Sequence, residues 1–163
     1  MKYWLMRAGS GGIAKQFCLQ HDVIAMDWEV GDLSKLPDDL EAFKAAYRSA
    51  YPMDSKGQVD QNASTIHRFV HIMHIGNWVA LSNAKDQWIY LGEVVGSYAF
   101  HPAPPGDAKA FRHQREVRWQ VAYPRRAFSE AFNTSLKSEL TLFNLDEHAD
   151  EIQAKLGSLR HNH

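Results

Sequence analysis

The chain has 163 residues, 45% hydrophobic and 12% aromatic, a length that suits one domain with one core. Its 18 Lys and Arg against 19 Asp and Glu give a net charge of -1, so any basic surface for nucleic acid must be local. A single cysteine excludes an internal disulfide and a multi-cysteine zinc site. No stretch approaches the roughly 20 apolar residues of a membrane span, and we expect a cytoplasmic protein.

The first 21 residues predict a strand, a loop and a helix. Tyr3–Arg7 forms a short apolar run, and Ile13 and Phe17 lie four residues apart on one helical face. The Gly-rich loop between them, residues 8–12, either binds a phosphate on free backbone N–H groups or forms a plain turn. It lacks the GxGxxG spacing of a nucleotide site. Within the helix, Cys18 is expected to be a small buried hydrophobe.

A second apolar run, Val23–Met26, is followed by Trp28 and then by a Gly-Asp turn. Turn residues after β-branched and apolar ones place Trp28 where a strand becomes a loop. Two interpretations fit such a tryptophan. Either it caps the core, or it forms one wall of a pocket for a flipped base.

Two helices are predicted next, over Pro37–Ser49 and over roughly Asp60–His74. In the second, His67, His71 and His74 recur on one side. This spacing fits either a metal site or an exposed histidine face. Since no acidic or cysteine ligand lies near them in the sequence, we expect neither a metal nor another cofactor.

The next segments predict a hairpin, with strands over 77–82 and 88–100. Gly92 and Gly96 interrupt its second strand and indicate bends or bulges, the devices by which a sheet curls into a barrel. A Pro-rich loop, 101–107, follows as a flap, and strands are predicted over 111–122 and 140–145. The expected fold is α+β, a curled, mostly antiparallel β-barrel flanked by helices.

Basic residues gather in one part of the chain, within eighteen positions: Lys109, Arg112, Arg115, Arg118, Arg125 and Arg126. Such a cluster either follows a phosphate backbone, with salt-dependent and sequence-blind contacts, or covers a solvated strand face. Composition alone does not separate the two interpretations.

The five tryptophans differ in placement. Trp4 and Trp119 fall in the middle of predicted strands, whereas Trp28, Trp78 and Trp88 fall at strand ends near polar turn residues. Aromatic walls with a few polar groups are what a flipped base requires, because stacking contributes roughly 1–3 kcal/mol per base. Core packing remains the alternative for each of the three.

Motifs for catalysis are absent from the sequence. It holds no Gly-x-Ser-x-Gly elbow, no His-Glu-x-x-His and no convincing carboxylate set for a metal-dependent nuclease. We therefore expect a binding module and not an enzyme.

A series of short motifs runs along the chain: Arg7-Ala8-Gly9 with Gly12, Ala25-Met26-Asp27-Trp28, Gly31-Asp32-Leu33-Ser34, Ala50-Tyr51-Pro52, Arg68-Phe69-Val70 with Met73, Gly76-Asn77-Trp78-Val79, Leu91-Gly92-Glu93-Val94 with Gly96 and Tyr98, Arg115-Glu116-Val117-Arg118-Trp119, and Tyr123-Pro124-Arg125. In this order they resemble the N-terminal EVE-like domain of modification-dependent restriction endonucleases. That family belongs to the PUA superfamily, with the YTH readers of methylated RNA. The resemblance spans about residues 3–145. It departs from the family pattern at Asn77, where a carboxylate is usual.

The resemblance implies a DNA-binding module that flips 5-methylcytosine or 5-hydroxymethylcytosine out of double-stranded DNA into an aromatic pocket. A separate C-terminal nuclease domain or partner nuclease, of HNH or Mrr type, would cut the DNA. Residues 146–163 would then form a helix and polar tail that begin the linker. By position, Trp28 and Ser34 flank one pocket wall, and the opposite side comes from the hairpin that carries Trp78, Ser82, Asn83 and Trp88.

Three alternatives remain open at this stage. The chain could recognise modified RNA bases, which only contacts to the 2′-OH would distinguish. It could also be a small enzyme that acts on a nucleotide, or a protein-interaction domain that uses its helices.

Overall fold

The computed structural model describes residues 1–8, 13–83, 86–103, 111–138 and 140–160. Its strands form one sheet in the order β2-β6-β4-β3-β1-β7, with β5 paired to β6. Within the described residues β1 and β3 are parallel, and the other pairs are antiparallel. The strands are β1 (Tyr3–Arg7), β2 (Val23–Met26), β3 (Trp78–Ser82), β4 (Trp88–Val94), β5 (Ala99–Phe100), β6 (His113–Pro124) and β7 (Leu142–Asn144).

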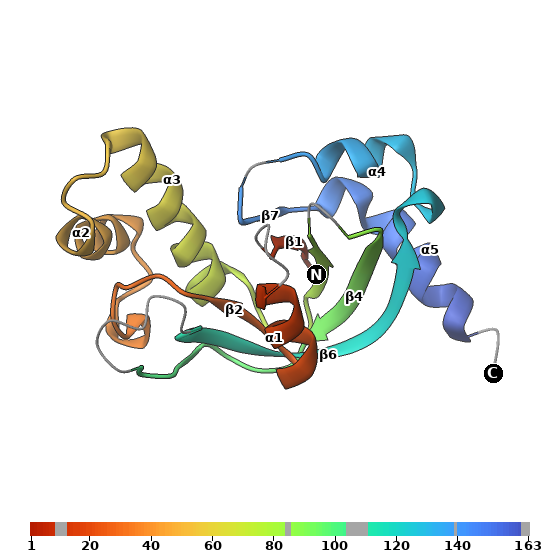
Figure 1. Cartoon of the computed structure of the whole chain (residues 1–163), viewed down its shortest axis with the longest axis horizontal. Coiled ribbons are helices and arrows are strands. Elements are labelled where there is room, and N and C mark those ends of the chain that lie inside the picture. Colours follow the sequence, from red (N-terminus) through yellow and green to blue (C-terminus); the bar gives the residue numbers. More distant parts are fainter. Residues whose placement is uncertain (9–12, 84–85, 104–110, 139, 161–163) are drawn as a thin grey trace.

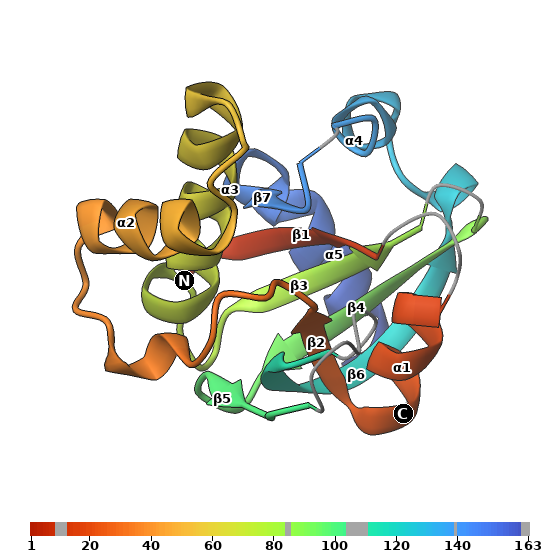
Figure 2. The ribbon, with the colours of Figure 1, turned by 60° about the vertical axis from the view of Figure 1, so that its left-hand side comes forward.

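Helices cover the sheet from two sides: α2 and α3 lie at one end of the molecule, and α4 and α5 at the other (Figure 1). The α-helices are α1 (Ile13–His21), α2 (Leu40–Ala50), α3 (Lys56–His67), α4 (Glu130–Ser135) and α5 (Ala149–Arg160). Shorter turns are η1 (Leu33–Lys35), η3 (Arg125–Ala127), η4 (Asp146–His148) and the π-helical η2 (Arg68–Ile72). The predicted fold class is confirmed, as a strongly curled half-barrel flanked by helices (Figure 2).

The curl depends on a bulge between β4 and β6. Leu91 pairs with Val121 but Gly92 pairs with Trp119, so β6 carries one extra residue at this point. A Cβ atom on Gly92 would lie 2.5 Å from Val117 Cγ1 and 2.7 Å from Trp119 Cε3. The absent side chain thus allows β6 to bend across β4, as Figure 1 shows along its length. The bulge predicted at Gly92 is confirmed.

The core has two parts, one on each face of the sheet. Trp4 and Met6 belong to the larger cluster, which also contains residues of α1, α2 and α3. Tyr3 and Leu5, which alternate with them along β1, belong to a smaller cluster with α4 and α5. Because both faces are covered, these four neighbouring side chains of β1 are all buried.

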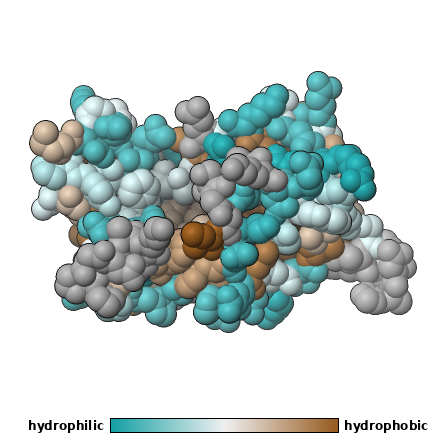
Figure 3. Space-filling model, viewed as in Figure 1, coloured by the Kyte–Doolittle hydropathy of each residue, from teal (hydrophilic) through white to brown (hydrophobic). Residues whose placement is uncertain are grey.

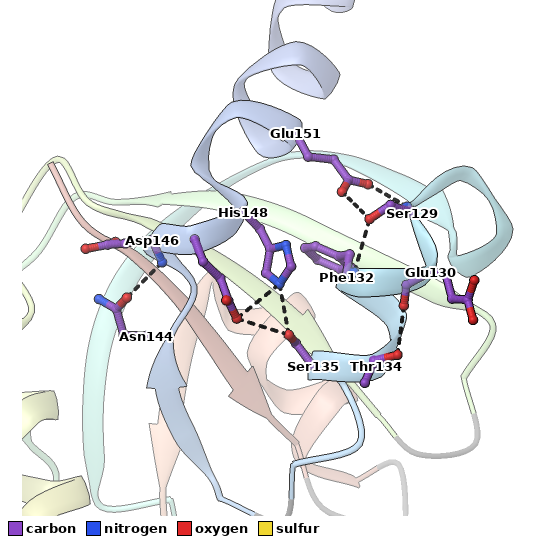
Figure 4. A network of polar contacts seen from close by, with 10 residues as sticks. Ser129, Glu130, Phe132, Thr134, Ser135, Asn144, Asp146, His148 and Glu151 are labelled. Carbon is purple, nitrogen blue, oxygen red and sulfur yellow. Dashed lines mark hydrogen bonds and ion pairs between the residues drawn. The ribbon is translucent and has the colours of Figure 1, made fainter.

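The C-terminal helix α5 packs against the body of the domain. Ile152 and Leu156 are buried in the smaller cluster. The backbone N–H and the hydroxyl of Ser129 donate to the two carboxylate oxygens of Glu151, at 2.7 and 2.6 Å (Figure 4). Ser135 Oγ and His148 Nε2 lie 2.8 Å apart in the same network. These contacts hold α4 and α5 together.

The predicted starts of two helices were wrong, because their N-cap residues lie at other positions. The helix expected from Pro37 begins at Leu40, because the Asp39 side chain accepts from Glu41 N. The helix expected over Asp60–His74 begins at Lys56, after a capping box formed by Ser55 and Gln58. It then changes at Arg68 into the π-helical turn η2. Among the described residues, no helix is long and apolar enough to cross a membrane.

We predict that Gly92→Ala lowers the free energy of unfolding by roughly 1–3 kcal/mol, because the new methyl group would collide with Val117 and Trp119. Chemical denaturation measures this change. Gly157→Ala in α5 is the control, since a Cβ there meets nothing within 4 Å and alanine favours a helix. Equal stability of the two variants would contradict the role given to the bulge.

Candidate functional site

A cavity of about 180 Å³ lies where the ends of β1 and β2 approach each other. Three strands separate β1 from β2 in the sheet, so it is the curl that brings these ends together. The volume is below the roughly 300–1,000 Å³ of pockets for drug-sized ligands, and it suits a single small ring. The lining residues are Met6, Arg7, Ala8, Ala14, Ala25, Met26, Asp27, Trp28, Phe111 and Thr141.

Two aromatic rings line the cavity, and each is supported by other rings. Trp28 is half-buried and meets Tyr47 and Tyr51 edge-on, with centroid distances of 5.9 and 6.1 Å. Phe111 packs on Phe17 of α1 at 4.6 Å. The edge-on contacts of Trp28 and the tilted contact of Phe111 restrict the orientation of both rings, so the aromatic walls are formed before a ligand enters.

Polar groups at the cavity come from the ends of β1 and β2. The Arg7 Nη1 donates to the carbonyl of Ser138 at 2.6 Å, and the Arg7 backbone N–H donates to Thr141 O at 2.7 Å. Asp27 lines the same cavity and is exposed. A positioned guanidinium and a carboxylate are therefore available to a ligand with both acceptors and donors on its edge.

A buried hydrogen-bond relay holds the Trp28 backbone. The Leu33 N–H donates to Tyr98 Oη at 3.2 Å, and Tyr98 Oη lies 2.6 Å from His113 Nδ1. His113 Nε2 lies 2.7 Å from the carbonyl oxygen of Trp28. A carbonyl only accepts, so Nε2 carries the hydrogen and Nδ1 accepts from the Tyr98 hydroxyl. All donors and acceptors of the relay are then satisfied by one tautomer.

Burial keeps both ring systems of this relay neutral. Desolvation lowers the pKa of the fully buried His113 below its ordinary value of 6.5, against the opposing effect of its bond to the Trp28 carbonyl. Burial likewise raises the pKa of Tyr98 to about 12. The neutral imidazole is the form that the hydrogen-bond directions require.

Among the residues that the resemblance assigns to the pocket, Trp28 is the one that lines this cavity. Ser34 lies beyond it in η1, exposed, where its hydroxyl donates to Asp32. Trp78 pairs with Tyr3 at the start of β1, whereas the cavity lies at the end of β1. Four residues of strand, roughly 13 Å, separate the two positions. Trp78 packs instead against the smaller core cluster.

The rest of the hairpin also faces elsewhere. Ser82 pairs with Arg7, but its Oγ accepts from Arg125 Nη2 at 3.1 Å. Asn83 is buried, and its carbonyl accepts from the same Arg125 nitrogen at 2.6 Å. Trp88 is 46% exposed at the start of β4. The structure therefore does not place the hairpin opposite Trp28, and the opposite side of the cavity comes from β1, α1, Phe111 and Thr141.

The arginines predicted to follow a phosphate backbone do not share one surface. Arg112 and Arg115 are buried, at 8% and 3% exposure. Arg112 lies 3.7 Å from Glu29, and Arg115 donates to backbone carbonyls. Both guanidinium groups are therefore withdrawn from the outer surface of β6, and their contact with a phosphate backbone stays a prediction.

The other basic residues differ from one another as well. Arg118 is exposed near Glu93, and Arg126 is exposed in η3. Arg125 is half-buried and holds the β3–β4 connection through the carbonyls of Asp86 and Asn83. Lys109 lies outside the described residues, as do most of the Gly-rich loop and of the Pro-rich flap. Arg118 and Arg126 are thus the predicted phosphate contacts that the structure leaves accessible.

The histidines considered for a metal site and the single cysteine were the remaining candidate residues. His67 Nε2 lies 2.7 Å from Asp38 Oδ1, and His71 Nε2 lies 3.1 Å from the carbonyl of Leu36. Groups of three or more metal-ligating side chains are absent from the described part of the chain. Cys18 is buried as predicted, and burial raises the pKa of its thiol to about 12, so the thiolate is disfavoured.

Sequence reasoning missed the residues opposite Trp28. Phe111, Met6 and Arg7 line the cavity, but no local pattern relates them to Trp28. One signal was available: β1 and β2 flank α1 in a β-loop-α-β unit, so the ends of these two strands were candidates to lie near each other. Asp27 precedes Trp28 in the motif Ala25-Met26-Asp27-Trp28 and is the polar lining residue nearest to it in the sequence.

Residues 4–146 match the family described as "Domain of unknown function (DUF8426)", and the chain belongs to this family. No curated protein matches the sequence.

Figure 3 shows a mostly hydrophilic face, with hydrophobic colour gathered near its centre.

The solved structures that are similar to this chain include the following three, each at low sequence identity. One is the YTH domain of the Zygosaccharomyces rouxii MRB1 protein in complex with N6-methyladenosine RNA (TM-score 0.47, 12% identity, covering 95% of this chain and 85% of that one). The second is a protein from Rhodopseudomonas palustris (TM-score 0.43, 12% identity, covering 98% of this chain and 94% of that one). The third is a protein from Agrobacterium tumefaciens (TM-score 0.39, 13% identity, covering 93% of this chain and 90% of that one).

We predict that Tyr98→Phe lowers the free energy of unfolding by about 1–3 kcal/mol, because it leaves His113 Nδ1 and the Leu33 N–H buried without their partner. Chemical denaturation measures the loss. Tyr123→Phe is the comparison, since that hydroxyl serves the C-terminal helix through Lys155 O. Only Tyr98→Phe should also change the fluorescence of Trp28, and an unchanged signal would contradict the relay.

We predict that stability falls with pH below about 6.5 because of His113. The folded protein holds the neutral imidazole, so the unfolded chain binds more protons once the pH drops under the unfolded pKa. The contribution of His113 is complete above pH 6.5 and is lost as the pH falls from there toward the lower folded pKa. Urea unfolding of the wild type and of His113→Gln across this range measures the difference. Parallel pH profiles would contradict it.

Proposed function

We propose that this chain recognises a modified cytosine, 5-methylcytosine or 5-hydroxymethylcytosine, flipped out of double-stranded DNA into the cavity beside Trp28. The observation that carries the proposal is the cavity itself, with its ring-sized volume, its supported aromatic walls and its adjacent Arg7 and Asp27. An extruded base needs a stacking surface and partners for its hydrogen-bonding edge.

The chemistry of the lining fits cytosine. The exocyclic amine of cytosine donates and its ring nitrogen and carbonyl accept, which matches a carboxylate from Asp27 and a guanidinium from Arg7. Apolar atoms of Met6 and Met26 line the same cavity and suit a 5-methyl substituent. Stacking on Trp28 adds roughly 1–3 kcal/mol to binding.

In this proposal the chain binds and does not cut. Among the described residues, the side chains that line the cavity include no serine, cysteine or histidine. The module would serve as the specificity domain of a modification-dependent restriction endonuclease. The cutting would belong to a separate nuclease domain or a partner nuclease.

The second candidate is recognition of a modified base in RNA. The same stacking and edge contacts would hold such a base, and a protein distinguishes RNA from DNA by its contacts to the 2′-OH. Unstacking a base in single-stranded RNA also costs less free energy than flipping a base out of a duplex.

We predict that the chain binds a duplex with one modified cytosine more tightly than the matched unmodified duplex, by about tenfold or more. Fluorescence anisotropy with cytosine, 5-methylcytosine and 5-hydroxymethylcytosine duplexes, beside methylated and unmethylated RNA, measures the preference at several salt concentrations. Equal weak binding to all of these would refute the proposal, and a preference for methylated RNA would favour the second candidate.

We predict that Trp28→Ala removes the preference for the modified duplex, because it removes the stacking wall. Trp88→Ala is the matched control, since Trp88 is exposed and lies outside the cavity. Arg126→Ala should weaken all duplexes alike and reduce the dependence on salt. If Trp88→Ala instead abolished the preference while Trp28→Ala kept it, the binding surface would be the hairpin.

A further inference from the structure

A second hollow, of about 500 Å³, lies beside the π-helical turn η2 and shares no lining residue with the cavity at Trp28. We call it the η2 groove. Its lining consists of Val70, His71, Met73, His74, Ile75, Ser97, Tyr98 and Arg115. No carboxylate is among these residues.

Arg115 is the charged group of the η2 groove, and it is 3% exposed. Its Nε donates to Gly96 O at 3.1 Å, and its Nη1 donates to the carbonyls of Phe69 and Met73. The π-helical turn leaves these last two carbonyls for a side chain to bind. Two of the three guanidinium nitrogens therefore bind backbone.

The third nitrogen, Nη2, has no hydrogen-bond partner among the described residues. It is also not among the completely buried side-chain atoms that lack a partner, so part of its surface is exposed. Arg115 lines the η2 groove, so the open route to Nη2 leads through that groove. Two N–H donors of a buried guanidinium thus face a space that a ligand can enter.

The positive charge of Arg115 is not balanced by an acid. Among the described residues, every ion pair within 4.0 Å involves other cations. Burial lowers the pKa of the guanidinium to about 10, and no neighbouring carboxylate opposes this effect. A buried charge without a counter-charge is costly. Backbone carbonyls satisfy its hydrogen bonds but supply only partial charge.

We propose that the η2 groove binds a phosphate group through Arg115 Nη2, either as free phosphate or as a phosphodiester. The hydroxyl of Ser97 and the exposed ring of His74 line the same groove and supply further donors. A tetrahedral oxyanion offers several acceptor oxygens to donors from different directions, and its charge balances the guanidinium. The site goes beyond base recognition and does not depend on it.

The test uses the full chain with inorganic phosphate against chloride at constant ionic strength. We expect saturable binding in calorimetry or NMR titration, with the largest amide shifts at residues 70–75 and 96–98. Absence of saturation, or shifts elsewhere, would overturn the proposal. Arg115 itself is a poor variant, since its removal frees three carbonyls and threatens the fold.

Ser97→Asp and Ser97→Asn form the matched pair of variants. Ser97 is exposed, so both should fold. The new carboxylate would lie in the same groove as the Arg115 guanidinium and repel an anion there, so Ser97→Asp should weaken phosphate binding roughly tenfold relative to Ser97→Asn. It should also raise the thermal midpoint in phosphate-free buffer, because it balances the Arg115 charge. Equal behaviour of the two variants would leave Arg115 as a purely structural group and refute the site.

The source of the phosphate is separated by three small probes: inorganic phosphate, dimethyl phosphate and acetate. Binding of dimethyl phosphate assigns the groove to a phosphodiester, and binding of inorganic phosphate alone assigns it to free phosphate. Preference for acetate would overturn the proposal. Since none of these ions carries a base, failure here is distinct from failure of modified-cytosine recognition.

Discussion

The buried imidazole of His113 is the constraint on which the candidate site depends. It lies in β6 between two neighbouring strands, paired with Met26 of β2 and Phe100 of β5. Through its two nitrogens it also joins Tyr98 to the carbonyl of Trp28. Three segments distant in the sequence are thus fixed at one point, and the loop that carries Trp28 leaves β2 in a defined direction.

The curl of the sheet brings the other wall of the cavity, from β1, close to Trp28. Without the bulge at Gly92, β6 would run straight, and the edge strand β2 would stay far from β1. The bend instead brings Asp27 and Trp28 opposite Met6 and Arg7. A backbone irregularity on one pair of strands therefore determines the shape of a cavity formed by two others.

Local patterns predicted local features well. The alternation of Val117, Arg118 and Trp119 gave the inner and outer faces of β6, and glycine within an apolar strand gave the bulge. The same alternation assigns Arg115 to the inner face with Val117, and the structure buries it there. Interpreting it as a phosphate contact on a solvated surface gave more weight to its charge than to its position.

Features that depend on strand order could not be derived from such patterns. Trp78 lies far from the cavity because β3 is parallel to β1 in a register that pairs it with Tyr3. Hairpin patterns do not specify which other strand joins the sheet, or in which direction. Phe111 was missed for the same reason, since its neighbours at the cavity come from β1, β2 and α1.

The order of donors in the His113 relay bears on how the cavity binds. A buried network in which every group is satisfied by one tautomer has one favourable arrangement, so it holds Trp28 in place before a ligand arrives. A wall fixed in advance costs less ordering entropy on binding than one formed by the ligand. Tyr98, which also lines the η2 groove, extends the same rigid connection to that second site. The two sites are therefore held at a fixed separation, and a ligand that occupies both must match it.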